Sequence, residues 1–149
     1  MGAKSKAKAE WDATLIAQGA HADELTANCP DLEQWPRSWM YEERDLTHGQ
    51  QVVECFKPFL RHLLSSGPSR KALRSHRDNL WILGGEIISK LHEDPRLRKR
   101  PTDQIVLAVL HDEGGPLISH SGSEDQQRSF DSTCRKFFRF LKERNTGGQ

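Results

Sequence analysis

Two helix-patterned segments joined by a short turn place the strongest constraint on how this chain can fold. Across residues 47–91, apolar side chains recur every three or four positions, which is the period of a helix that buries one face. The turn between the segments reads Ser65-Ser66-Gly67-Pro68-Ser69, where Gly67-Pro68 ends one helix and Ser69 suits the N-cap of the next. We therefore predict two consecutive long helices, over residues 47–64 and 70–92.

Both helices contain residues that favour a specific local geometry. Thr47, with Gln50 three positions later, matches a capping box, which satisfies backbone N–H groups at a helix start. Pro58 lies inside the first helix, removes one backbone hydrogen bond and predicts a kink. Gly84 and Gly85 lie in the middle of the second helix, where they cost roughly 2 kcal/mol relative to alanine. The close approach of another helix, or of a ligand backbone, would explain them.

Three further segments favour helices. They are residues 4–26, residues 103–111 and residues 123–143. Asn28-Cys29-Pro30 breaks the helical pattern just after the first of them. The last begins with a second capping box, formed by Ser123 and Gln126, and carries an apolar stripe. That stripe consists of Phe130, Cys134, Phe137 and Leu141.

The chain shows no strand-like alternation of polar and apolar residues, so we predict an all-α fold, a compact bundle of four to five helices. An N-terminal extension over residues 1–46 would combine the first helix with an aromatic-rich connector at residues 32–41. The helical core domain would span residues 47–143, and residues 144–149 would form a flexible tail.

Composition excludes several classes of protein. No apolar stretch approaches the roughly 18 residues that would cross a bilayer, and no secretory signal follows the basic start of the chain. Cys29, Cys55 and Cys134 are far apart and odd in number, so neither a disulfide framework nor a closed zinc site is expected. We therefore expect a cytoplasmic protein with no membrane partner and no bound metal or cofactor.

Charge is segregated along the chain although the net charge is only +1. Residues 10–56 contain 2 basic and 10 acidic side chains, whereas residues 57–100 contain 11 basic and 4 acidic ones. Such segregation can create a basic face that attracts phosphate groups. The basic helices can equally pair with the acidic segments inside the fold, and the sequence leaves both explanations open.

Three stretches of the chain carry a resemblance to a known family. They are Phe59-Leu60 through Ser66-Gly67-Pro68-Ser69-Arg70-Lys71-Ala72-Leu73-Arg74-Ser75-His76, then Asn79-Leu80-Trp81, and later Phe137-Phe138-Arg139-Phe140-Leu141. Together they are similar to the N-terminal core-binding, SAM-like domain of tyrosine recombinases and phage integrases, over about residues 47–143. The resemblance implies a helical bundle that lies across one face of duplex DNA, while a separate domain of the family cuts the DNA.

The chain also departs from that family in ways that bear on catalysis. A recombinase needs a tyrosine nucleophile, and the one tyrosine here, Tyr41, precedes the similar region. None of the seven histidines is followed by Arg three residues later, and 149 residues leave no room for the catalytic domain. We therefore expect a non-catalytic binding module from a mobile genetic element rather than an enzyme.

The residues expected to bind nucleic acid are basic or lie at a helix start. They are Arg61, Ser69, Arg70, Lys71, Arg74, Arg77, Arg98, Lys99 and Arg100. Their cations and the free N–H groups at a helix start would contact phosphates of duplex DNA, so binding should weaken with salt. Asn79 is the candidate for contact with a base.

Two other functions fit the same sequence. A protein-interaction module or inhibitor, such as an adaptor, an antitoxin or a phage- or plasmid-encoded regulator, could act through the acidic N-terminal region and through Trp35, Trp39 and Tyr41. A metal site at His111-Asp112-Glu113 and His120 is less favoured than a solvated loop. The phosphate-binding loop, nucleophile-elbow and zinc-protease motifs are absent from the sequence. The oligomeric state stays open.

Overall fold

A computed structural model of the chain describes residues 24–118 and 123–147, with side chains of the second range to Arg144. Within these ranges the chain is helical and forms no β-strand beyond a single bridge between His111 and Gly114. The predicted all-α class is therefore confirmed. Most of the helix predicted over residues 4–26 lies outside the described residues, and residues 24–28 are helical up to the predicted break at Cys29.

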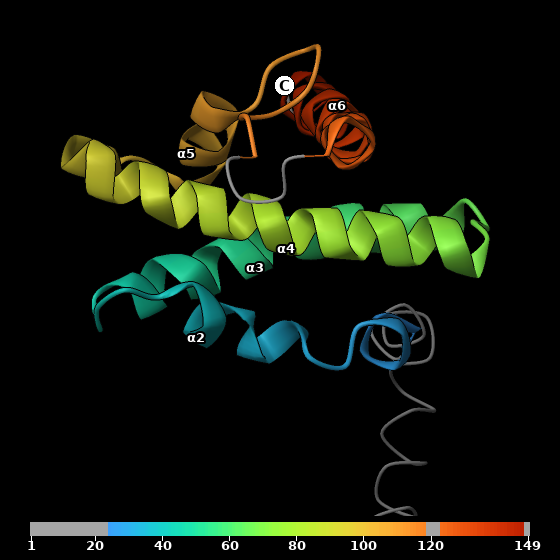
Figure 1. Cartoon of the computed structure of the whole chain (residues 1–149), viewed down its shortest axis with the longest axis horizontal. Coiled ribbons are helices and arrows are strands. Elements are labelled where there is room, and N and C mark those ends of the chain that lie inside the picture. Colours follow the sequence, from blue (N-terminus) through green and yellow to red (C-terminus); the bar gives the residue numbers. More distant parts are fainter. Residues whose placement is uncertain (1–23, 119–122, 148–149) are drawn as a thin grey trace, which may run out of the picture.

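The helices form three layers. In chain order they are the 3₁₀ helix η1 (Leu32–Gln34), α2 (Trp35–Trp39), α3 (Asp45–Ser65), α4 (Arg70–Glu93), the 3₁₀ helix η2 (Pro95–Lys99), α5 (Thr102–Val109) and α6 (Glu124–Gly147). Figure 1 shows α3 and α4 running antiparallel along the longest axis, with α2 on one side of them and α5 and α6 on the other. The 24-residue helix α4 packs against helices of both outer layers, so it is the central element of the fold.

Two serine caps set the starts of the long helices as predicted. The Ser69 Oγ atom accepts a hydrogen bond from the backbone N–H of Ala72 at 3.1 Å, and α4 follows. The Ser123 Oγ atom accepts one from Gln126 N–H, also at 3.1 Å, and α6 follows. The predicted apolar stripe of α6 is buried. The helix continues to Gly147, into the segment that the sequence had assigned to a tail.

The start of α3 differs from the prediction. The helix begins at Asp45, two residues before Thr47, so the capping box predicted at Thr47 and Gln50 is wrong. The Asp45 carboxylate instead accepts hydrogen bonds from the backbone N–H groups of Tyr41 (2.9 Å) and Glu42 (3.1 Å). This fully buried carboxylate orders the chain entering the helix. Further along, α3 continues through Pro58 to Ser65 as one helix, and the kink expected there stays a prediction.

One hydrophobic core joins the predicted extension to the helical bundle. Its centre is a group of phenylalanines from α3 and α6, with ring centroids 4.8 Å apart for Phe59 and Phe137 and 5.4 Å apart for Phe56 and Phe137. The segment before residue 46 adds five buried side chains to the same core. They are Leu25, Cys29, Leu32, Trp35 and Trp39. The expected boundary at residue 46 therefore does not separate two cores.

A tryptophan from α2 explains the glycine pair of α4. A Cβ atom added at Gly84 would lie 2.0 Å from Cζ2 of Trp39, far inside van der Waals contact. The Trp39 Nε1–H group donates to the backbone carbonyl of Trp81 at 2.9 Å, which holds the ring against the helix. The close approach of a neighbouring helix, expected from the sequence, is confirmed. At Gly85 an added Cβ would meet the Trp39 ring at an ordinary 3.6 Å, so only Gly84 is required by packing.

We predict that Gly84→Ala and Gly85→Ala change stability in opposite directions. The first overlaps a buried ring and should lower the free energy of unfolding by about 1–3 kcal/mol. The second relieves the propensity cost of glycine and should be neutral or should stabilise the helix by up to about 1 kcal/mol. Urea denaturation followed by circular dichroism measures both. Equal stability of the two variants would contradict the packing of Trp39 against Gly84.

Candidate functional site

Three arginines of α4 converge on one groove. Arg70, Arg74 and Arg77 are spaced four and three residues apart, so they share one side of the helix. Together with Leu73 they line a hollow of about 330 Å³ whose other wall is formed by Ala27 and Asn28. None of the described residues that line it is acidic. We call this site the arginine groove.

The cations of the arginine groove are available to a ligand. Arg70, Lys71 and Arg74 are exposed, and within the described ranges none of them forms an ion pair. Arg77 lies 3.5 Å from the carboxylate of its chain neighbour Asp78, at a surface where such a pair contributes little. The groove therefore holds positive charge that the described part of the fold leaves largely uncompensated.

The start of α4 contributes backbone donors beside these side chains. Ser69 uses an Oγ lone pair to cap the helix, while its O–H proton remains able to donate to a ligand oxygen. The N–H groups of Arg70 and Lys71 occupy the first turn, where no carbonyl of the same helix can reach them. The positive end of the helix dipole adds to the attraction for an anion.

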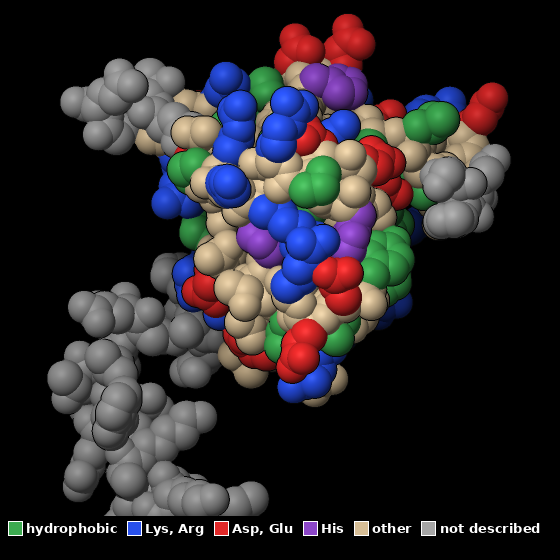
Figure 2. Space-filling view, turned by 90° about the vertical axis from the view of Figure 1, so that its left-hand side faces the viewer, with side chains coloured by type: hydrophobic (Ala, Val, Ile, Leu, Met, Phe, Trp, Pro, Cys, Tyr) green, Lys and Arg blue, Asp and Glu red, His purple; other side chains and the backbone are tan. Residues whose placement is uncertain are grey.

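The remaining predicted basic residues lie elsewhere. Arg61, on α3, lines a separate hollow of about 140 Å³ beside Lys57, whose Nζ atom pairs with Glu33 at 2.8 Å and Glu54 at 2.6 Å. Arg98, Lys99 and Arg100 follow the end of α4, roughly 24 Å along the helix axis from Arg77, the nearest residue of the arginine groove on that helix. Figure 2 shows that end of the molecule, where Lys and Arg side chains alternate with His, Asp and Glu. The predicted residues thus do not form one basic surface.

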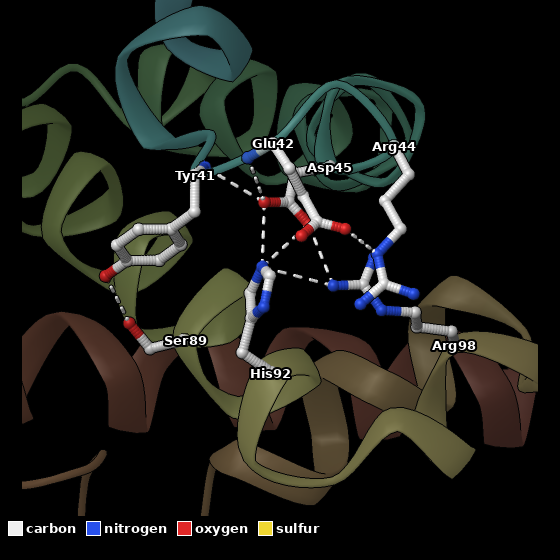
Figure 3. A network of polar contacts seen from close by, with 7 residues as sticks. All are labelled: Tyr41, Glu42, Arg44, Asp45, Ser89, His92 and Arg98. Carbon is white, nitrogen blue, oxygen red and sulfur yellow. Dashed lines mark hydrogen bonds and ion pairs between the residues drawn. The ribbon is translucent and has the colours of Figure 1, made fainter.

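Arg98 and His92 are committed to a buried ionic network (Figure 3). Arg98 has a side chain only 10% exposed, and its Nη2 atom donates to Asp45 Oδ1 at 2.8 Å. His92 Nε2 lies 2.8 Å and 2.9 Å from the two oxygens of the same carboxylate. The predicted contact between Arg98 and a nucleic acid is therefore corrected, because breaking this pair would leave a buried charge without its partner.

The same network determines the charge state of Asp45. Burial alone would raise the pKa of Asp45, but hydrogen bonds from His92, from Arg98 and from two backbone N–H groups hold this pKa well below its usual range. Because the carboxylate is ionised and can only accept, His92 Nε2 carries a proton and donates to it. The 3.2 Å contact between Arg98 Nη2 and His92 Nε2 then joins two donors that meet at one carboxylate.

The aromatic residues predicted to bind a partner are divided between core and surface. Trp35 and Trp39 are buried in the core, so only their edges can reach a ligand, whereas Tyr41 is 70% exposed. Trp81 is 44% exposed and was missed by the sequence reasoning, although its position off the apolar stripe of α4 is the signal that could have identified it. Asn79 is buried and donates to Ser129 and Thr133, which corrects its predicted contact with a base.

Thiol and metal chemistry find no support in the described residues. Burial raises the pKa of Cys29 to about 12 and that of Cys55 to about 11, and it raises the pKa of Cys134 as well, so these thiols are protonated near neutral pH. No group of three or more metal-ligating side chains is found within residues 24–118 and 123–144. His111, Asp112 and Glu113 are exposed, and His120 lies outside the described residues.

Comparisons with protein-family models, with curated proteins and with solved structures find no match for this chain. None of the described helices is both long and apolar enough to span a membrane. The geometry of the site itself is therefore the basis for inferring function.

We predict that Asp45→Asn lowers the free energy of unfolding by about 3–5 kcal/mol at pH 7, because Arg98 loses its buried counter-charge. A carboxyl group whose pKa is lowered on folding stabilises the protein above its unfolded pKa. That contribution is lost as the pH falls toward the folded pKa. The difference between the two proteins should therefore shrink by about 1 kcal/mol for each pH unit below roughly pH 4.

Urea denaturation at several values between pH 7 and pH 3 measures this difference. Glu42→Gln is the matched control, since it removes the carboxylate of the exposed Glu42–Arg44 pair and should change stability by less than about 1 kcal/mol. A pH-independent difference for Asp45→Asn would contradict the ionised state of Asp45.

Proposed function

We propose that this protein binds the phosphate backbone of duplex DNA through the arginine groove, without cleaving it. The observation that carries the proposal is the convergence of Arg70, Arg74 and Arg77 on one hollow that no described acidic residue lines. Guanidinium groups bind phosphate oxygens through paired hydrogen bonds, and three of them along one helix face can follow successive phosphates. The resemblance to the core-binding domain of recombinases supports the same assignment, in a cytoplasmic protein of a mobile genetic element.

The proposed binding is mainly electrostatic and shows little preference for sequence. The donors at the arginine groove are cations, backbone N–H groups and the Ser69 hydroxyl, and at a helix start these groups contact phosphate rather than base edges. Asn79, the one residue expected to contact a base, is buried and engaged with α6. If Arg70, Lys71, Arg74 and Arg77 all neutralise phosphates, log Kd should change with log salt concentration with a slope of about 3 to 4.

We predict that the double variant Arg70→Ala/Arg74→Ala weakens binding to a labelled duplex at least about tenfold at low salt. Its salt slope should also fall by about 1.8, because two phosphate contacts are lost. Fluorescence anisotropy at several salt concentrations measures both quantities. The matched control is Lys99→Ala/Arg100→Ala, which removes two exposed cations at the other end of α4 and should change affinity less than about twofold.

Equal losses in the two double variants would mean that the whole surface, rather than the arginine groove, attracts DNA. Unchanged affinity in Arg70→Ala/Arg74→Ala would reject the proposed site. Surface variants are used because deleting residues 1–44 would remove five core side chains and so confuse loss of binding with loss of folding.

A protein-interaction function is the second candidate, and one observation favours it. The exposed side chains of Tyr41 and Trp81 line a groove that is separate from the arginine groove. This groove differs in size, charge and chemistry from a phosphate site, and it can operate whether or not DNA is bound.

A further inference from the structure

An aromatic groove lies along the second half of α4. It has a volume of about 600 Å³, against about 330 Å³ for the arginine groove. The side chains that give it its character are Trp39, Tyr41, Trp81, Ile82, Glu93 and Ile118. They come from α2 and the residues after it, from α4 and from the segment that follows α5, so three separate parts of the chain form its walls.

The exposed hydrophobic surface of the described residues is concentrated at this groove. The large hydrophobic side chains exposed within those residues are Tyr41 (70%), Trp81 (44%) and Leu117 (79%). Tyr41 and Trp81 line the groove, whereas Leu117 does not. Isolated exposed hydrophobic residues are common, but two exposed aromatic rings that line one hollow are typical of a binding surface.

Hydrogen bonds hold the aromatic walls in place before any ligand arrives. Trp81 Nε1–H donates to Ser38 Oγ at 2.9 Å, and Trp39 Nε1–H donates to the Trp81 carbonyl at the same distance. The Tyr41 hydroxyl and Ser89 Oγ are 3.0 Å apart and share a hydrogen bond. Rings fixed in this way lose little conformational freedom on binding, which is the property of residues that dominate interface energies.

The charge of the groove indicates the charge of its ligand. Glu86 and Glu93 line it, and none of its described lining residues is Lys or Arg. Lys90, one turn before Glu93 on the same helix, forms a long 3.9 Å surface pair with Glu93, which contributes little and leaves its carboxylate accessible. A neighbouring hollow shares Trp81 and Ile82 with it and adds Asp31 and Asp78, together with Arg77, which lies 3.5 Å from the Asp78 carboxylate. A phosphate backbone would be repelled here, so this surface does not extend the DNA site. An apolar ligand with positive charges at its edges is complementary to it.

The combined length of the two neighbouring hollows, which share Trp81 and Ile82, indicates the shape of the ligand. They follow α4 from Arg77 to Glu93, which corresponds to roughly 24 Å along the helix axis. A helix of about 16 residues has that length, and an amphipathic helix that lays its apolar face in a groove is a common form of peptide recognition.

We propose that the aromatic groove binds an amphipathic helical segment of a protein partner, with Trp81 and Tyr41 against its apolar face and Lys or Arg side chains of the segment facing Glu93 and Asp31. This interaction does not require the proposed DNA binding. Trp81 is the central anchor, because it lines both hollows. Its carbonyl accepts a hydrogen bond from Trp39 and its indole N–H donates one to Ser38, so it also fixes the wall that α2 forms.

The test uses the full chain and a phage-displayed library of random peptides about 16 residues long. Selected peptides should share apolar residues at helical spacing together with Lys or Arg, and synthetic copies should bind in fluorescence anisotropy. Trp81→Ala should weaken them about tenfold or more. Glu93→Lys, an exposed substitution that should not affect folding, should weaken them about fivefold.

Glu143→Lys is the matched control, because it reverses an exposed glutamate on α6 outside the groove and should leave the affinity within about twofold. Arg70→Ala/Arg74→Ala should also bind these peptides normally, which separates this site from the DNA site. The proposal would be overturned if the selected peptides are acidic, or if Trp81→Ala and Glu93→Lys leave their affinity unchanged.

Two results that reveal a different occupant of the aromatic groove would also overturn the proposal. Self-association of the full chain that Trp81→Ala abolishes, seen by sedimentation equilibrium, would mean that a second copy covers the groove. A gain of about tenfold in peptide affinity when Lys4, Lys6 and Lys8 are all changed to Glu would mean that the basic start of this chain competes for it.

Discussion

The contact between Trp39 and Gly84 holds α2 against α4, beside the arginine groove and the aromatic groove. Trp39 lies across α4 at its pair of glycines, Gly84 and Gly85, and its indole N–H donates a hydrogen bond to the Trp81 carbonyl. This contact fixes residues 24–41 alongside α4 rather than away from it. The strip between them is open on one side, and both grooves lie along that strip, with Ala27 and Asn28 facing arginines and Tyr41 facing the later turns.

A second anchor fixes the other end of the same segment. Asp45 binds the backbone of Tyr41 and Glu42 and is itself held by His92 and Arg98. Because a buried carboxylate needs all of these donors, the turn before α3, the end of α4 and the 3₁₀ helix η2 are tied to one another. Tyr41 therefore presents its ring from a backbone that is fixed on both sides, by Trp39 and by Asp45.

Local features of the structure were predictable from the sequence, because they depend on residues near in the chain. The periodicity of α4, its cap at Ser69 and the buried stripe of α6 all follow from spacings of three and four. The start of α3 was not predictable in this way. Thr47 and Gln50 have the correct spacing for a cap, but Asp45 competes through partners 47 and 53 residues away, His92 and Arg98.

For the same reason, the sequence predicted only some of the residues that line the two grooves. The sequence identified the cations of α4 but not the opposite wall at Ala27 and Asn28, because nothing in their own pattern places them beside Arg74. The sequence analysis also grouped Arg98 with the exposed cations, whereas Arg98 is buried in an ion pair with Asp45 and cannot contact DNA. Exposure separates an aromatic anchor from a core residue, and exposure depends on tertiary packing: Trp39 is 5% exposed and Trp81 is 44% exposed.

The arginine groove and the aromatic groove come within about one helical turn of each other on α4. Because their charges are opposite, a ligand in one groove affects binding in the other. Arg77 belongs to the arginine groove and to the edge of the next hollow, and Trp81, one turn later, belongs to that hollow and to the aromatic groove. Trp81 follows Arg77 and Arg74 by about 6 and 10 Å along the helix axis. A cationic segment bound beside Trp81 would therefore bring positive charge to about 10 Å from phosphate bound at Arg74, roughly one Debye length at physiological salt. At that distance a unit charge attracts a bound phosphate by about 0.4 kcal/mol in water before screening. A basic partner in the aromatic groove should thus strengthen the binding of DNA slightly rather than compete with it, because the carboxylates that attract the partner are the groups that otherwise repel phosphate.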